Sequence, residues 1–329
     1  MNRYHKQMLV KQLGPEGQKK LGNTTIGIVG VGALGCVVAE LLCRAGVKKL
    51  VLIDHDVVEE DNLHRQFLYC EQDIGKVKVE IAKKALEQMN KKVKIQALGQ
   101  HLSERNCAKL LKGCDMFVDC TDHLETRFAM NSYGRQAKIP WIFGAIAGTQ
   151  GLVFTVLSEG PCFSCIFERV QQGKDCQAEG ILATTASIVA SMQVVALFRL
   201  ITESKTEPTL YVIDTWNSTT EAVKVSKKID CTGCAGEQNQ KSKDSTFSVE
   251  FCDTRAAYEI KPSKNVTLDL HAIKKHFNDI IVETPIVLVL RVEGEEIIVH
   301  NYGNVLVKEC KDIKKIKRIG EKLYYYRSK

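Results

Sequence analysis

Two short stretches of this chain carry the groups that bind a phosphorylated nucleotide. The first is a glycine loop, GVGALG, in which Gly30, Gly32, Ala33 and Gly35 would form the floor of the site. Glycine lets the backbone turn tightly and approach a phosphate, and a helix that follows points free N–H groups at the anion. The second is Asp54, 19 residues after Gly35, which can accept hydrogen bonds from a ribose hydroxyl. A glycine-rich structural turn is the alternative interpretation of the loop alone.

Residues 55–67 are too polar for a core element and rich in functional groups. Loops at the carboxyl ends of parallel strands are where open α/β sheets bind ligands, so Asp56, Asn62, Arg65 and Gln66 are candidates to face a nucleotide. Lys78 lies near the start of a predicted helix, where the helix dipole disfavours a positive charge. This position indicates that Lys78 interacts with an anion. A solvated loop and a surface lysine remain the alternatives for these residues.

Another polar stretch, which contains Asp122 and His123, follows a predicted buried strand at residues 115–120. Asp122 is therefore expected in the same crevice as the glycine loop. A carboxylate beside a polyphosphate repels it unless Mg²⁺ lies between them. This favours a nucleoside triphosphate over a dinucleotide, which needs no metal.

Four cysteines form two CxxC pairs, Cys162 with Cys165 and Cys231 with Cys234. Each pair can place two thiolates on one ion from a tight turn, so the pattern predicts a tetrahedral Cys₄ structural zinc site. A redox pair and unrelated buried cysteines are the alternatives.

The remaining cysteines are mostly expected to be small buried hydrophobes, with Cys36, Cys43, Cys114 and Cys120 the clearest cases. Cys176 differs, because it lies in a polar loop flanked by glycines where a thiol would be exposed and could ionise. The residues alone leave it open whether Cys176 is reactive or a bystander.

Alternating strands and helices must position these groups. Residues 25–29 and 50–53 are predicted strands, and the apolar residues between them recur at helical spacing until Gly46. Asp73 is expected to cap the next helix. Further predicted strands cover 93–97, 115–120, 139–145, 151–157, 210–214 and 222–225, with a long apolar helix over 186–201. The fold class is thus α/β, a Rossmann-like doubly wound sheet.

The composition changes after Cys234. Residues 1–235 are expected to form the nucleotide-binding domain, 236–245 a linker, and 246–329 a small α+β C-terminal domain without a catalytic constellation. The net charge of +7 peaks in the basic run at residues 311–329, which favours a solvated helix face over nucleic-acid binding. A polar amino terminus and the expected lack of an 18-residue apolar run predict no membrane span and a cytoplasmic location.

Together these motifs, in this order, resemble the MoeB/ThiF family, the bacterial and archaeal relatives of ubiquitin-activating enzymes. The resemblance covers about residues 3–235 and rests on GVGALG (30–35), LIDHD (52–56), DNLHRQ (61–66), GKVKVE (75–80), DCTDH (119–123) and the CxxC pairs. It implies ATP-dependent adenylation of the terminal Gly-Gly carboxylate of a ubiquitin-fold carrier protein, with release of pyrophosphate. It also implies a homodimer.

The resemblance assigns roles to the candidate residues. Asp54 would hold the ribose, and Asp122 would hold Mg²⁺. Asn62, Arg65 and Lys78 would neutralise the triphosphate and the charge that develops in the transition state. Cys176 would lie in the crossover loop over the active site, where some relatives form a thioester or an acyl disulfide with the carrier.

Two departures from the family pattern are visible. Lys6 stands where many members have an arginine that reaches the partner subunit's triphosphate, and lysine lacks the bidentate fork. His123 stands where an asparagine commonly follows the metal-binding aspartate.

Other functions compete with adenylation. A nicotinamide-dependent oxidoreductase explains residues 30–54 equally well, but it gives Arg65, Lys78 and Asp122 no role. A relative that activates a tRNA-bound carboxyl group and a binding protein that has lost activity are further alternatives. For the C-terminal domain, contact with the carrier or a downstream partner is one hypothesis.

Overall fold

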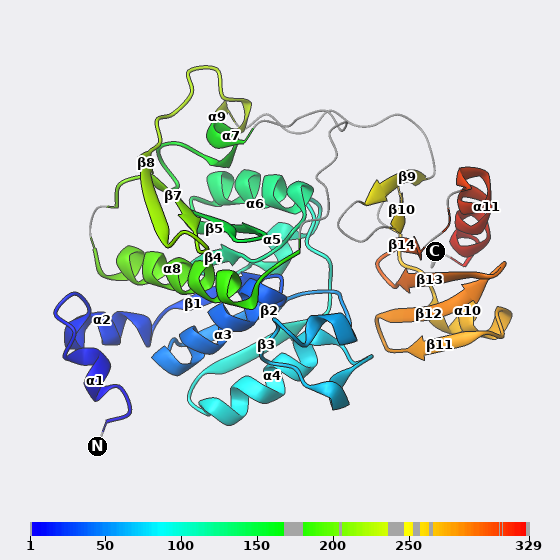
Figure 1. Cartoon of the computed structure of the whole chain (residues 1–329), viewed down its shortest axis with the longest axis horizontal. Helices are drawn as coiled ribbons and strands as arrows, with labels where there is room; N and C mark the ends of the chain where they lie inside the picture. The colour runs from blue at the N-terminus through cyan, green and yellow to red at the C-terminus, as the bar shows by residue number, and fades with distance from the viewer. Residues whose placement is uncertain are drawn as a thin grey trace.

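A computed structural model describes residues 2–167, 180–203, 206–235, 247–252, 257–262, 266–308, 310 and 312–326. Cys176 and the expected linker, 236–245, lie outside these residues. Two sheets organise the described chain (Figure 1), and we refer to residues 2–235 as the N-terminal unit and to residues 247–326 as the C-terminal unit.

The N-terminal unit is built on an eight-stranded sheet of order β3-β2-β1-β4-β5-β6-β7-β8. Its strands are β1 (Thr25–Val29), β2 (Lys49–Ile53), β3 (Lys94–Leu98), β4 (Met116–Asp119), β5 (Trp141–Ala147), β6 (Gln150–Val156), β7 (Thr209–Asp214) and β8 (Thr219–Lys224). The first five strands in this order are parallel, and β6 to β8 continue the sheet antiparallel. The chain moves outward from β1 to β3 and then returns to β4, so the order reverses between β1 and β4. Ligands bind at such a switch point in open α/β sheets.

Helices cover both faces of this sheet, as a doubly wound fold requires. The helices are α1 (His5–Met8), α2 (Gly14–Leu21), α3 (Ala33–Ala45), α4 (Lys78–Met89), α5 (Cys107–Leu110), α6 (Leu124–Ala137), α7 (Phe163–Ile166), α8 (Ala183–Thr202) and α9 (Thr232–Ala235). One core cluster joins the sheet to α3, α4 and α8, and a second joins it to α5, α6 and α7. Figure 1 shows these two groups on opposite sides of the strands. The predicted fold class is confirmed.

The glycine loop begins where β1 ends and leads directly into α3. Gly30 has φ +87°, and a Cβ there would lie 2.6 Å from the Cys120 carbonyl oxygen. A Cβ on Gly35 would lie 2.1 Å from the Gly30 carbonyl oxygen. These two glycines are therefore required by the packing of the loop itself. Gly32 is different, because its φ is −89° and a Cβ would meet only the Gln66 amide nitrogen, at 3.8 Å.

Helix α8 corrects one sequence expectation. Contrary to the prediction of no 18-residue apolar run, α8 has 20 residues and a window of mean hydropathy 1.6, and by length and composition it could cross a membrane. Half of that window is buried, and the helix packs against α3, β5 and β6. Its apolar composition is accounted for by this place in the core.

Other local predictions also differ from the structure. Asp73 does not cap α4: the helix begins five residues later, at Lys78, and Asp73 instead accepts a hydrogen bond from the Cys70 N–H and pairs with Lys76. Helix α6 was missed, although it lies between two correctly predicted strands. The predicted buried state of Cys36, Cys43, Cys114 and Cys120 is confirmed.

The C-terminal unit is a six-stranded antiparallel sheet of order β11-β12-β13-β14-β10-β9 with two helices. Its elements are β9 (Phe247–Cys252), β10 (Ala257–Pro262), α10 (Leu270–His276), β11 (Ile280–Glu283), β12 (Val287–Val292), β13 (Glu295–His300), β14 (Val305–Lys308) and α11 (Ile313–Tyr324). The basic run forms α11 as predicted, with Ile316, Ile319 and Leu323 buried. Strands β10 and β11 were not predicted.

We expect Gly30→Ala to lower the free energy of unfolding by about 2–4 kcal/mol, because it forces an L side chain to a positive φ and against the Cys120 carbonyl. Gly32→Ala is the matched control in the same loop and should cost less than about 1 kcal/mol. Urea denaturation followed by circular dichroism measures both. Equal losses for the two variants would contradict this account of the loop.

Candidate nucleotide site and cysteine cluster

A cavity of about 440 Å³ lies at the carboxyl ends of β1, β2 and β4, within the size range of small-molecule sites. Most of the predicted nucleotide-binding residues line it, drawn from the glycine loop, the end of β2, the polar loop after β2, the start of α4 and the end of β4. They are Gly30, Gly32, Ala33, Asp54, Asp56, Asn62, Arg65, Gln66, Lys78, Asp122 and His123. Gly35 does not line the cavity but supports the loop from beneath.

Asp54 ties the glycine loop to the polar loop. Its Oδ2 accepts a hydrogen bond from the Val31 N–H at 2.6 Å, and its Oδ1 accepts one from the Asp56 N–H at 2.8 Å. Burial and the nearby Asp56 carboxylate raise the pKa of Asp54, opposed by Lys78 and by these hydrogen bonds. Each carboxylate oxygen has a second lone pair, so Asp54 can still accept a ligand hydroxyl.

The glycine loop is also held from behind. The Tyr69 hydroxyl donates to the Val31 carbonyl at 2.8 Å, and the Gly30 N–H donates to the Ile53 carbonyl at 2.8 Å. Burial, followed by nearby acidic groups, raises the pKa of Tyr69, so this hydroxyl stays a donor. The loop is therefore fixed before any ligand arrives.

Lys78 is the first residue of α4 and is only 6% exposed. Its Nζ lies 3.5 Å from Asp56 Oδ2, and its backbone N–H donates to the Asp56 carbonyl at 3.0 Å. A buried ammonium needs a compensating charge, and the carboxylate supplies it. The cationic end of Lys78 is thus held at the cavity wall by a residue of the same site.

The polar loop forms a compact turn, which the sequence interpretation did not foresee. Asn62 is 4% exposed, and its amide oxygen accepts from the Glu59 N–H at 3.3 Å while its amide nitrogen donates to Asp61 at 2.6 Å. Gln66 is 4% exposed, and its amide oxygen has no hydrogen-bond partner within the described part of the chain.

Arg65, on the same loop, also lines the cavity. Its guanidinium donates to the Asp61 carbonyl at 2.5 Å and lies 2.8 Å from His64 Nε2. Neither contact neutralises the guanidinium, so its charge remains available to an anion.

At the end of β4, Asp122 is the more open of the two predicted residues, with 63% of its side chain exposed. The His123 ring nitrogen lies 3.5 Å from the Asp122 carboxylate. Asp122 lines the cavity together with Arg65 and Lys78, so charged groups of both signs are present there.

Sequence reasoning missed Arg127, which lies on the unpredicted helix α6 and also lines the cavity. Its Nε donates to the fully buried Asp119 at 2.9 Å, and its guanidinium also donates to the Thr121 carbonyl and lies over the Phe143 ring. Burial raises the pKa of Asp119, although Arg127 opposes the shift. The sequence gives no signal for this pair, because the two residues are eight positions apart. Only the folding of α6 brings their side chains together.

One predicted residue, Lys6, lies away from the cavity. Lys6 is exposed on α1 and does not line the cavity; in Figure 1, α1 lies at the opposite end of the unit from the C-terminal sheet. Cys176 is outside the described residues, and its role stays a prediction.

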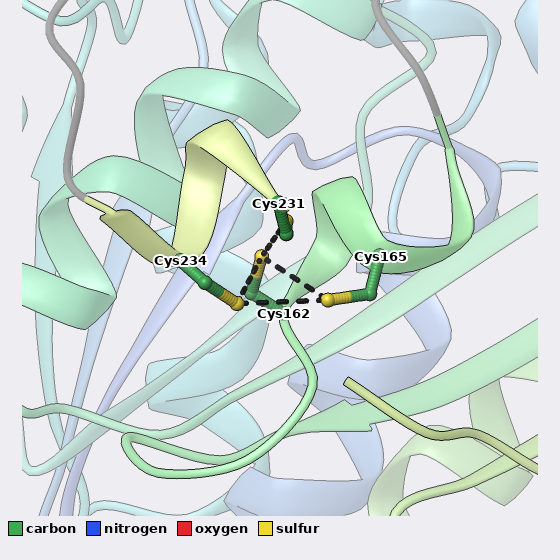
Figure 2. Close-up of side chains that lie close together, drawn as sticks. All are labelled: Cys162, Cys165, Cys231 and Cys234. Carbon is green, nitrogen blue, oxygen red and sulfur yellow. Dashed lines mark hydrogen bonds between the residues drawn. The ribbon is translucent and has the colours of Figure 1, made fainter. Parts of the chain in front are cut away.

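The four cysteines of the CxxC pairs converge between α7 and α9 (Figure 2), although 65 residues separate the pairs in sequence. Cys162 Sγ lies 4.0 Å from Cys165 Sγ, 3.6 Å from Cys231 Sγ and 3.4 Å from Cys234 Sγ, and Cys165 Sγ lies 3.5 Å from Cys234 Sγ. A tetrahedral zinc site with zinc–sulfur bonds of about 2.3 Å has sulfur–sulfur separations of about 3.8 Å. The spacing therefore fits a four-thiolate zinc site.

The surroundings of the cysteine cluster favour the thiolate form of Cys165. Burial opposes ionisation of Cys165, but backbone and thiol hydrogen bonds outweigh it and lower its pKa to about 7. Burial raises the pKa of Cys231 and of Cys234. A bound cation would be needed to hold all four as thiolates at neutral pH.

Comparisons with known proteins agree with this geometry. The sequence model of the ThiF family matches residues 4–233. The sulfur carrier protein ThiS adenylyltransferase of Bacillus subtilis is 32% identical over 97% of this chain and 98% of that protein. The SAMP-activating enzyme E1 of Haloferax volcanii is 31% identical over 77% of this chain and 95% of that protein. A crystal structure of MccB from E. coli with MccA-N7isoASN has the same fold, with a TM-score of 0.64, 22% identity, and coverage of 71% of this chain and 75% of that one.

We expect Arg127→Met to lower the free energy of unfolding by about 3–5 kcal/mol, because it leaves the Asp119 carboxylate buried without a cation. The matched control is Arg44→Met, which removes an exposed pair with Glu40 and should cost less than about 1 kcal/mol. Urea denaturation measures both. A loss for Arg127→Met as small as that of the control would show that Asp119 adapts without its partner.

Proposed function

Because the chain belongs to the ThiF family, we propose that it adenylates the carboxyl terminus of a ubiquitin-fold carrier protein with ATP. The products are a carrier acyl-adenylate and pyrophosphate. The chain is an adenylyltransferase, as its relatives from B. subtilis and H. volcanii, an adenylyltransferase and an activating enzyme E1 by name, support. The proposed carrier ends in Gly-Gly.

The observation that carries this proposal is the charge pattern of the cavity. Arg65, Lys78 and Asp122 all line the cavity, together with the glycine loop. A dinucleotide would use the glycine loop and Asp54 but would give Arg65 and Asp122 no role. The pattern suits a triphosphate, and it disfavours a nicotinamide-dependent oxidoreductase.

In this mechanism the terminal carboxylate of the carrier attacks the α-phosphorus of ATP, and pyrophosphate leaves. The attacking carboxylate is already ionised at neutral pH, so no general base is needed. Asp54 holds the ribose hydroxyls, the glycine-loop N–H groups and the N-terminus of α3 contact the phosphates, and Arg65 and Lys78 stabilise the charge that develops on them. Asn62 and Gln66 orient the polar loop and the nucleotide. Catalysis thus comes from positioning and electrostatics.

Asp122 is suited to hold Mg²⁺, because its carboxylate is largely exposed and lines the same cavity as Arg65 and Lys78. The metal would screen the repulsion between this carboxylate and the triphosphate. His123, beside it, stands where an asparagine is common among relatives, and it would orient Asp122 through their 3.5 Å contact.

The cysteine cluster is proposed to hold a structural zinc ion. Four thiolates leave no open coordination position, so the ion would join the loop after β6 to the segment after β8 and take no part in the reaction. None of the four cysteines lines the nucleotide cavity.

Further features of the proposal concern assembly and location. We propose a homodimer, in which Lys6 of one copy would reach the nucleotide of the other, and a soluble cytoplasmic enzyme. We also propose a nucleotide-binding domain at 1–235, which the family match over residues 4–233 supports, a linker at 236–245 and a C-terminal domain at 246–329. Cys176 would act on the carrier after adenylation.

The decisive experiment is exchange of labelled pyrophosphate into ATP, with Mg²⁺ and candidate Gly-Gly carriers. We expect exchange with one carrier and a loss of about 10²–10³-fold for Lys78→Met, because a cation that stabilises developing charge is removed. Lys76→Met is the matched control: Lys76 is half exposed, pairs with Asp73 and does not line the cavity. Absence of exchange with every Gly-Gly carrier, or equal activity of the two variants, would overturn the proposal.

Metal analysis tests the zinc site separately. We expect about one zinc per chain by inductively coupled plasma mass spectrometry, and loss of that zinc in Cys231→Ser. Cys114→Ser, which changes a buried cysteine outside the cluster, should retain it. Purified protein without zinc but with a disulfide between cluster residues would support the redox alternative instead.

A further inference from the structure

The sheet of the C-terminal unit has two apolar faces, and only one is covered by its own helices. Leu288, Leu290, Ile297, Val299, Val305 and Val307 pack under α10 and α11. The alternate residues face the other way, because successive side chains in a strand point to opposite faces. They form a second apolar cluster of Ala257, Val287, Val289, Ile298 and Leu306. This second face packs on the N-terminal unit through Val57.

The same alternation points polar residues of the C-terminal unit at the nucleotide cavity. His300 follows Ile298 by two positions in β13, and Lys308 follows Leu306 by two in β14. Six residues of the C-terminal unit line the cavity together with the glycine loop and Asp54: Ala257, Val287, Ile298, His300, Leu306 and Lys308. The cavity is therefore enclosed by both units.

Contacts along the rim hold the two units in this arrangement. Lys308 Nζ lies 3.6 Å from the Glu59 carboxylate, and Lys261 Nζ lies 3.1 Å from the Glu125 carboxylate. Ile286 fits so closely over Gly99 that a Cβ on that glycine would lie 2.7 Å from its Cδ1. The contacts involve the ends of β2, β3 and β4, which carry the site.

Four imidazole rings from both units line this cavity, and Tyr302 stacks on two of them. The ring cluster consists of His55 after β2, His101 after β3, His123 after β4, and His300 and Tyr302 of the C-terminal unit. Ring centroids lie 4.9 Å apart for His55 and His101, 5.0 Å for His55 and His300, and 5.4 Å for the stacked pair His101 and Tyr302. Tyr302 also stacks on His300, at 5.0 Å.

The position of the ring cluster relative to Asp54 indicates which part of ATP it meets. The phosphates belong at the glycine loop after β1, and the ribose belongs at Asp54 after β2. The strand order β3-β2-β1 continues this line outward to His101 after β3. A base attached to a ribose at Asp54 would therefore extend toward the rings that line the cavity.

We propose that the C-terminal unit is part of the nucleotide site: it closes the cavity beside Asp54 and supplies His300 as a ring that packs against the purine base of ATP. His101 provides a second ring from the N-terminal unit, and Tyr302 is a positioning residue that stacks on both. Since the base touches both units, ATP binding strengthens the contact between them. The proposal rests on the adenylation function and assigns to the C-terminal unit a role in binding the ATP that this reaction consumes.

A metal ion is the competing occupant of the same place. Ligand atoms of His55, Asp56 and His300 all lie within 4.8 Å of one another. The Lys78 ammonium, however, lies 3.5 Å from the Asp56 carboxylate and already supplies a positive charge there. A divalent cation would be repelled by this lysine, whereas a neutral purine would not.

The test compares binding of Mg-ATP with binding of Mg-tripolyphosphate, which lacks base and ribose, by isothermal titration calorimetry on the full chain. We expect His300→Ala and His101→Ala to weaken ATP binding about 10-fold, as loss of one stacking ring does, with tripolyphosphate binding unchanged. His276→Ala is the matched control, because His276 is an exposed ring of the same unit, packed on Phe277 and Tyr326 and outside the cavity.

Hydrogen–deuterium exchange of the unaltered protein provides a second measurement, should His300→Ala fail to fold. ATP should slow exchange in residues 296–308, and tripolyphosphate should not. Unchanged ATP affinity in both ring variants, equal losses for ATP and tripolyphosphate, or no protection of residues 296–308 by ATP would each overturn the inference. If the unaltered protein binds no ATP, the adenylation function itself fails; if it binds ATP without these effects, only the role of the C-terminal unit fails.

Discussion

The carboxylate of Asp54 is the contact on which the nucleotide site depends. It accepts one hydrogen bond from the glycine loop and one from the loop after β2, so the same carboxylate holds both loops in place. Burial makes its charge costly, and the backbone N–H groups and Lys78 offset that cost. A group held in this way cannot move without disturbing both loops. The site is thus arranged before ligand binds, which is what positional catalysis requires.

Two cationic side chains near Asp54 are each paired with a carboxylate. Lys78 is held by Asp56, and Arg127 by Asp119, so each buried cation has its own carboxylate. Arg65 stands apart from this pairing, since its observed contacts are to a carbonyl and an imidazole. We infer that the paired ions shape the cavity and that Arg65 contributes most of the uncompensated positive charge that an incoming triphosphate would meet.

Two long-range closures complete the molecule. The cysteine cluster joins two segments that are about 65 residues apart in sequence. The second apolar face of the C-terminal sheet packs on the N-terminal unit, next to the nucleotide cavity. An antiparallel sheet with apolar residues on both faces needs cover on both. In this chain one cover is its own pair of helices and the other is the nucleotide-binding unit, so a requirement of packing also brings His300 and Lys308 to the site.

The amino-acid sequence alone was sufficient to predict the doubly wound sheet, the glycine loop with Asp54, the polar loop and the two CxxC pairs. These are local signals: strand and helix periodicity, glycine in a tight turn, and ligand spacing within four residues. The start of α4 was misplaced because Asp73 is a good capping residue whose side chain bonds to Cys70 instead. Tertiary structure alone decided the pairing of Arg127 with Asp119 and the approach of His300 to the cavity. Both depend on which helix or sheet face packs against which neighbour, and burial of apolar surface, which acts between segments distant in sequence, determines that choice.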